Sequence, residues 1–107
     1  MKNVKMIVAY PQPQDANAFD AVYQNEHVPL AVAKLEGKTK IVATKVLGSP
    51  QGKPAFYCIA EVHFLSMEAL QSCARSQGGQ ETLAHAAQIS TGGPPVVMIA
   101  EEDTFMF

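Results

Sequence analysis

The chain has 107 residues, 48% of them hydrophobic and 17% charged, with a net charge of −2. These values predict one folded domain over residues 1–107 and exclude a disordered chain, which would carry fewer apolar residues and more charge. No basic cluster and no apolar run of the roughly 18 residues needed to span a bilayer occurs, so we expect neither a nucleic-acid nor a membrane partner. Two cysteines without a secretory leader predict a cytoplasmic location.

The N-terminal third is predicted to contain a strand and a long helix. Residues 3–10 alternate between two faces, as a strand does, and end at a proline-rich turn. A helix is expected over residues 16–36. Asp15 or Asn17 can cap its start, and Gly37 is a suitable residue for its end.

The rest of the chain predicts three strands and a second helical region. Ser66 can cap the helix that follows the third strand, and the pair Gly78-Gly79 is expected to interrupt that helix. The remaining pattern predicts a second strand over residues 39–47 and a third over 55–64. It also predicts a short further helix over 80–88 and a last strand over 96–101.

This order, β-α-β-β-α-β, is typical of the α+β ferredoxin-like fold, a four-stranded antiparallel sheet with both helices on one face. The opposite face is predicted to be apolar as well, since Ile7 and Ala9 point there and the second and last strands are apolar on both sides. We therefore expect a homodimer joined through the sheet faces, with Ile7 and Ile99 as interface positions. The alternative is a monomer whose C-terminal tail folds over the sheet.

The segment YQNEHVPLA, residues 23–31, places a proline inside the first helix. Pro29 cannot donate a hydrogen bond to the carbonyl of Asn25, and it biases Val28 toward extended backbone. We therefore expect a kink or a break at residues 25–29, and of the two we predict a break. His27 would then lie on an irregular turn. Its imidazole titrates near neutral pH and suits acid–base chemistry. The alternative is a surface histidine, or one with a purely structural hydrogen bond.

These residues resemble the EthD-like family of the dimeric α+β barrel superfamily. The resemblance is carried by the Tyr-Pro turn at Tyr10, by Phe19 and Tyr23 in the helix, and by His27-Val28-Pro29-Leu30. The later segments FLSMEALQSCARS and VVMIAEE are similar as well. The resemblance implies a ferredoxin-like protomer, a dimer whose two sheets form a barrel, and a cavity between sheet and helices with the histidine in its wall.

The resemblance does not fix a reaction, because related barrels include cofactor-free lactone isomerases, polyketide cyclases or dehydratases, quinone-forming monooxygenases and haem-binding enzymes. Our leading hypothesis is a cofactor-independent enzyme of the isomerase, cyclase/dehydratase or monooxygenase type that acts on a small hydrophobic, oxygenated metabolite. His27 and Tyr23 are the expected catalytic residues. The expected substrate-binding residues are Tyr10, Phe19, Leu30, Phe56 and Phe64. One alternative is a non-catalytic accessory or ligand-binding protein, and a second is a haem protein with His27 as axial ligand.

The other two histidines are predicted to lie outside this site. His63 follows Glu61 by two residues and shares a strand face with it and with Tyr57, so the two form either an interface network, which we favour, or a polar cavity. His85 follows Glu81 by four residues and is predicted to be a solvated surface residue. No HxH, HxxxH or CxxC spacing occurs, so we expect neither a protein-held metal nor another cofactor.

Overall fold

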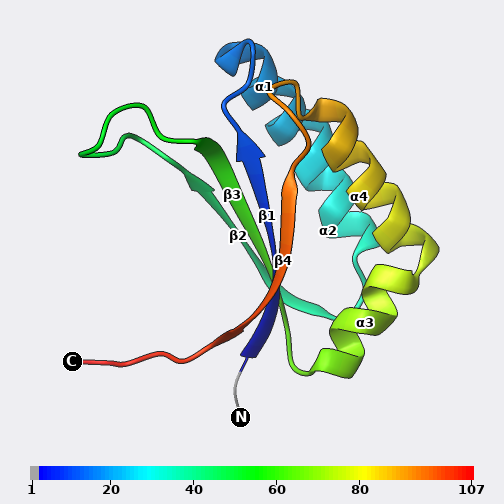
Figure 1. Cartoon of the computed structure of the whole chain (residues 1–107). Helices are drawn as coiled ribbons and strands as arrows, with labels where there is room; N and C mark the ends of the chain where they lie inside the picture. Colours follow the sequence, from blue (N-terminus) through cyan, green and yellow to red (C-terminus); the bar gives the residue numbers. More distant parts are fainter. Residues whose placement is uncertain (1–2) are drawn as a thin grey trace.

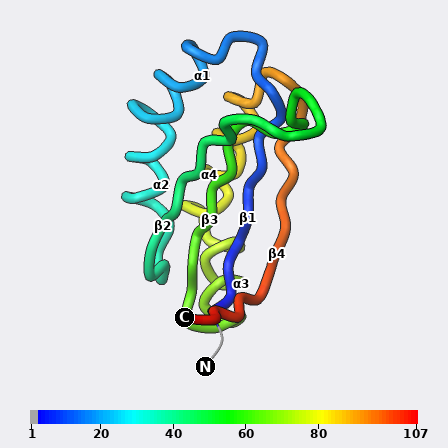
Figure 2. The backbone as a smooth tube through the Cα atoms, turned by 90° about the vertical axis from the view of Figure 1, so that its left-hand side faces the viewer, coloured from blue at the N-terminus to red at the C-terminus, as the bar shows by residue number. Residues whose placement is uncertain are grey.

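A computed structural model describes residues 3–107 and confirms the ferredoxin-like α+β fold (Figure 1). The elements, in chain order, are β1 (Asn3–Pro11), α1 (Ala16–Val22), η1 (Tyr23–His27), α2 (Val28–Lys34), β2 (Lys38–Lys45), β3 (Phe56–Phe64), α3 (Met67–Arg75), α4 (Gln77–Ile89) and β4 (Val96–Glu102). The strands form one antiparallel sheet in the order β2-β3-β1-β4 (Figure 2), and all the helices cover the same face of it (Figure 1).

The core lies between the sheet and the helices. Directly opposite residues of antiparallel strands point to the same face, so the pairing of Val8 with Ala60 and of Met6 with Val62 directs all four side chains toward the helices. Two groups of buried residues fill this layer. One surrounds Tyr10 and Phe19 near α1 and α4, and the other surrounds Phe64 and Leu70 near α2 and α3.

The first helical region contains Pro29 without breaking. Val28 has φ −60° and ψ −46°, which is ordinary helical backbone, so the predicted break and the extended Val28 are wrong. The chain instead forms a π-helical turn, η1, in which the Val28 N–H donates to the carbonyl of Tyr23, five residues earlier. A proline lacks the donor for the carbonyl four residues before it and its ring collides with that carbonyl, and a wider turn relieves both problems.

The second helical region is interrupted earlier than expected. α3 ends at Arg75, and Ser76, with ψ 160°, is the residue that separates it from α4. The hydroxyl of Ser76 accepts the N–H of Gly79 at 3.0 Å and so caps α4, while Ser66 caps α3 as predicted. Gly78 and Gly79 therefore belong to the first turn of α4.

These glycines allow the helices to approach closely. A Cβ on Gly78 would lie 2.3 Å from the carbonyl oxygen of Lys34 at the end of α2, and a Cβ on Gly79 would lie 2.0 Å from that of Cys73 in α3. Real Cβ atoms do not come so near to backbone. The glycine pair thus sets the distance at which α4 packs against the ends of the other two helices.

The outer face of the sheet carries no helix (Figure 1). Ile7 lies on this face and is paired with Met98, whereas Ile99 is paired with Met6 and therefore lies on the helix side, contrary to our expectation.

The C-terminal tail does not fold over the sheet, because it extends away from it (Figure 1) and Phe107 is fully exposed. Among residues 3–107, no helix combines the length and the apolar character needed to cross a bilayer.

The close packing at the start of α4 makes a testable prediction. Gly79→Ala should lower the free energy of unfolding by roughly 1–3 kcal/mol, because the added methyl group forces α4 away from Cys73. Gly48→Ala is the matched control, since no atom lies within 4 Å of its Cβ position. Urea denaturation at one protein concentration measures both. Equal stability of the two variants would contradict this account of the glycine pair.

Candidate functional site

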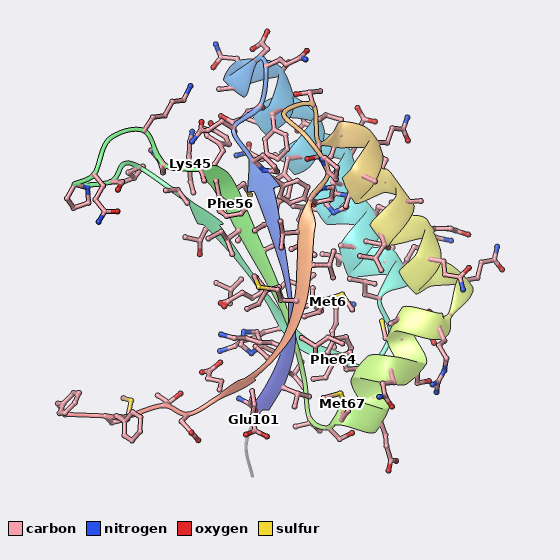
Figure 3. The ribbon with its side chains drawn as sticks, viewed as in Figure 1. Met6, Lys45, Phe56, Phe64, Met67 and Glu101 are labelled. Atoms are coloured by element: carbon pink, nitrogen blue, oxygen red, sulfur yellow. The ribbon has the colours of Figure 1, made fainter. Side chains whose placement is uncertain are left out.

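A small cavity lies between the sheet and the helices and offers about 40 Å³ of space that water could occupy. Its walls are almost entirely apolar. Met6 and Phe64 point into this layer from the sheet (Figure 3). The helices contribute Tyr23 and His27 from η1, Val28, Ala31 and Leu35 from α2 and its end, Cys73 and Ala74 from α3, and Gly79, Thr82, Leu83 and Ala86 from α4.

The cavity brings together four of the residues expected from the sequence. Tyr10, Tyr23, His27 and Phe64 line it. Phe19 stands behind this wall, where its ring contacts that of Tyr10 at 5.2 Å between centroids.

Two expected residues lie outside the cavity for backbone reasons. The π-helical turn holds one extra residue, so the positions that face the sheet after it fall one residue later than in a regular helix, and Ala31 replaces Leu30 at the wall. The register of β1 against β3 shifts between Tyr10 and Pro11. Phe56 lies at the start of β3, beyond this irregularity, and Tyr57 takes the inward position, where its ring lies 5.8 Å from that of Phe19 between centroids.

An aromatic row, defined as Phe19, Tyr23, His27 and His85, runs along one side of the cavity. The rings of Phe19 and Tyr23 are nearly parallel at 5.5 Å, and those of Tyr23 and His27 follow at 5.6 Å. Tyr10 meets the first three members edge-on. The imidazole of His27 is therefore held by rings from β1, from its own turn and from α4, and it is only 6% exposed.

His85 is in contact with His27, contrary to the prediction that it is a solvated surface residue. The two Nδ1 atoms lie 2.8 Å apart, and the ring planes differ by 9°. The centroid separation of 5.1 Å is close to that short contact plus the two ring radii, so the imidazoles meet edge to edge in one plane. This is the geometry of a straight N–H···N hydrogen bond.

The surrounding groups determine which nitrogen of His27 carries the proton. The hydroxyl of Tyr10, a residue with no exposed surface, lies 3.2 Å from Nε2 of His27. If the phenol donates to Nε2, Nδ1 of His27 carries hydrogen and donates to Nδ1 of His85. The opposite tautomer would leave the buried phenolic proton without an acceptor, at a cost of about 1–3 kcal/mol. We therefore assign the chain of donors as Tyr10 to His27 to His85.

Burial keeps the three rings of the inner site neutral. Desolvation, with a smaller contribution from the nearby His85, lowers the pKa of His27 to about 4. Desolvation likewise raises the pKa values of Tyr10 and Tyr23 above that of a free phenol. At pH 7 the cavity wall thus presents a neutral imidazole, able to act as a base, beside a protonated phenol, able to donate a hydrogen bond.

His85 is the residue that sequence reasoning missed. Its spacing from Glu81 predicts a surface pair, yet Glu81 contacts Gln77 and Lys34 instead. The buried positions Thr82, Ala86 and Ile89 do mark the inner face of α4, and His85 flanks that face. This periodicity could have indicated that His85 lies near the inner face of α4. That it contacts His27 follows only from the packing of α4 against η1.

A second polar group lies on the outer face of the sheet. Lys5 reaches Glu61 at 2.8 Å and Glu102 at 3.5 Å. His63 is 2% exposed, lies 3.6 Å from Glu102, and has no hydrogen bond on either ring nitrogen. Tyr57 does not share this group, because its hydroxyl donates to Asp20 of α1. Glu61 and His63 are therefore separated from the cavity by the sheet.

The residues present do not fit a haem or a metal centre. A cavity of about 40 Å³ is far below the several hundred Å³ of typical cofactor sites. Within residues 3–107, no three His, Cys, Asp or Glu side chains converge as a metal site requires.

The family model of the EthD domain matches residues 11–89. The structure of an EthD family protein from Bacillus halodurans is 36% identical, with a TM-score of 0.86, over 96% of this chain and 100% of that one. An uncharacterized 11.0 kDa protein of Rhodococcus erythropolis is 29% identical over 92% of this chain and 94% of its own length.

Two more distant structures share the fold alone. A dimeric ferredoxin-like protein of unknown function from Jannaschia is 14% identical with a TM-score of 0.67, over 95% of this chain and 100% of that one. The hydroxynitrile lyase of Passiflora edulis is 11% identical with a TM-score of 0.70, over 98% of this chain and 96% of that one. Together with the match over residues 11–89, the close relative from Bacillus halodurans shows that this chain belongs to the EthD family.

Proposed function

We propose that this protein is a cofactor-independent enzyme that moves a proton on a small hydrophobic, oxygenated metabolite, with His27 as the base. The observation that carries the proposal is the burial of the His27 imidazole in an apolar wall, with its Nε2 3.2 Å from the hydroxyl of Tyr10. The Nε2 lone pair can accept a proton from a C–H or O–H group. The Tyr10 hydroxyl can donate to the ligand oxygen on which negative charge develops.

A proton transfer of this kind would serve the isomerase, cyclase/dehydratase and monooxygenase types, because removing a proton beside a carbonyl or from a phenol gives an enolate or a phenolate. Tyr23 supports the base, since its ring lies parallel to that of His27 and fixes the imidazole plane. Its own hydroxyl lies beside Cys58, so we assign it an orienting role. Phe64 forms the apolar wall at the other end of the cavity.

The size of the cavity limits the ligand. A space of about 40 Å³ admits a few waters, so even a small organic ligand requires side chains to move. Met6 is the lining residue best able to yield, because its unbranched side chain has three rotatable bonds. The walls favour a compact, mostly apolar molecule with one oxygen to engage Tyr10.

A ligand-binding accessory protein is the second candidate function. It is favoured by the absence of any carboxylate from the cavity wall within the described chain, so that His27 has no acidic partner to receive or return a proton inside the cavity. Such a protein would use Tyr10 and His27 only to bind the ligand oxygen.

Deuterium incorporation distinguishes the two functions. A panel of small lactones, phenols and aryl ketones would be incubated with the protein in D₂O, and NMR would follow both binding and exchange of acidic C–H positions. We expect exchange with at least one compound, reduced at least 100-fold in His27→Gln. The matched control is Gln88→Leu, an exposed substitution on α4. Binding without exchange would favour the accessory role, and full exchange in His27→Gln would overturn the assignment of the base.

We also propose a homodimer joined through the outer faces of two sheets. Support comes from the lack of a helix on this face and from its apolar residues Ile7, Ile59 and Met98, of which Met98 is 46% exposed. The buried nitrogens of His63 lie on the same face and make no hydrogen bond within the protomer, although Nδ1 lies 3.6 Å from Glu102, and buried polar atoms need hydrogen-bond partners. The fold neighbour from Jannaschia is itself dimeric.

Analytical ultracentrifugation at micromolar concentration tests this dimer. The wild-type protein should sediment with twice the chain mass, and Met98→Asp should sediment as a monomer, because an isolated charge in an apolar interface is costly. Val32→Asp is the matched control, since Val32 is equally apolar and exposed but lies on α2, away from the sheet face. A monomeric wild type, or a dimeric Met98→Asp, would rule out this interface.

We further propose that the protein works in a reducing compartment such as the cytoplasm. Cys58 and Cys73 are free, buried and assigned to separate parts of the core. Burial raises the pKa of both thiols, which keeps them in the unreactive protonated form.

The neutral state of His27 should be visible in the pH dependence of stability. Its pKa is about 4 in the fold against 6.5 in the unfolded chain, so the unfolded chain binds the extra proton between these values. The contribution of His27 to the free energy of unfolding should therefore be constant above pH 6.5. It should fall by about 3 kcal/mol as the pH drops to 4. Urea unfolding of the wild type and of His27→Gln, which cannot titrate, isolates the effect. Identical pH profiles would show that His27 is not neutralised by burial.

A further inference from the structure

We propose that His85 connects His27 to the solvent, so that the two histidines form a proton relay from the cavity to the surface of the protein. This inference rests on the proposed role of His27 as a base and adds the route by which its proton leaves and returns. His85 contacts no ligand in this scheme; it acts through His27 and is a positioning residue.

A route of this kind is needed because the base is isolated from water. His27 is 6% exposed, and the cavity wall beside it is apolar. The titratable groups that face its ring are Tyr10 from β1, Tyr23 from its own turn and His85 from α4. Both phenols hold their protons tightly, since burial raises their pKa values. His85 is therefore the neighbour that can receive a proton from His27.

The contact between the two histidines has the geometry of a transfer path. The Nδ1 atoms are 2.8 Å apart and the rings share one plane. The shared hydrogen therefore lies almost on the straight line that joins the two nitrogens. Imidazole suits such a path because it can take a proton on one nitrogen and release another from the opposite nitrogen.

His85 also reaches the outside of the molecule. It is half-buried and lines a hollow on the surface between the first helical region and α4, whose wall includes Phe19, Glu26 and Gln88. Glu26 and Gln88 are both exposed, so this hollow is in contact with solvent. The relay thus uses the last two members of the aromatic row and runs from the buried His27 to His85 at the solvent-exposed hollow.

The proton balance of the relay is complete without another reactant. Nε2 of His27 accepts a proton from the ligand, Nδ1–H passes its proton to Nδ1 of His85, and Nε2–H of His85 releases one to water. Each imidazole ends neutral in its other tautomer. The reverse sequence takes a proton from water, returns one to the ligand, and restores both tautomers. A concerted transfer also avoids a buried imidazolium at His27, which its low pKa of about 4 disfavours.

The relay can be tested on the protein without any ligand by ¹H–¹⁵N NMR of the histidine side chains. In the wild type, His27 should be in the Nδ1–H tautomer, and its Nδ1–H should exchange with water. His85→Gln keeps an amide oxygen as acceptor but cannot pass a proton on, so it should retain the tautomer and slow the exchange at least tenfold. His85→Leu, which also removes the acceptor, should disturb the tautomer as well. Gln88→Leu, in the same hollow, should change neither.

The outcomes separate this relay from a structural role and from the proposed function. Unchanged or faster exchange in His85→Gln, with urea stability preserved, would overturn the relay, and so would a wild-type His27 in the Nε2–H tautomer. A structural role for His85 would alter stability in both His85 variants without slowing exchange in His85→Gln. These measurements involve no ligand, so their failure leaves the role of His27, judged by deuterium incorporation, standing.

Discussion

The missing backbone N–H of Pro29 is the constraint on which the site depends. A regular helix would require that donor for the carbonyl of Asn25, and the chain responds with one wide turn rather than a break. The turn keeps the helix continuous, so α2 still packs on the sheet and closes the far end of the cavity. It also changes which residues face inward after it. His27 and Val28 both line the cavity, which adjacent residues of a regular helix seldom do.

The polar part of the site is stable because each buried group has one partner of the right kind. In the assigned tautomer Tyr10 donates to His27, His27 accepts on one side and donates on the other, and His85 accepts. The three form a directional chain with no unsatisfied member. His63 on the outer face is the contrast, since it is as deeply buried and makes no hydrogen bond with either nitrogen, although its Nδ1 lies 3.6 Å from Glu102. The ring nitrogens of His27 are both hydrogen-bonded within the protomer, whereas those of His63 are not.

Much of the fold could be predicted from the sequence because it depends on local patterns. Alternation identified the four strands, and Ser66 marked the start of α3 correctly. The faces of Ile99 and Phe56 could not be predicted, because they depend on the register of β4 and on an irregularity near Pro11. The position of Leu30 required knowing that a proline widens a turn instead of ending a helix. His85 could not be assigned, because its partner is 58 residues away and meets it only through helix packing.

The wide turn makes the length of this segment more important than its composition. Gln24, Asn25 and Glu26 are exposed, so their side chains are free to vary. Removal of any one of them would return the helix to its regular period and rotate everything after it by about 100° relative to α1. Ala31 and Leu35 would then leave the sheet, and the imidazole would turn away from Tyr10. Substitutions should therefore accumulate in this turn during evolution while insertions and deletions are excluded from it.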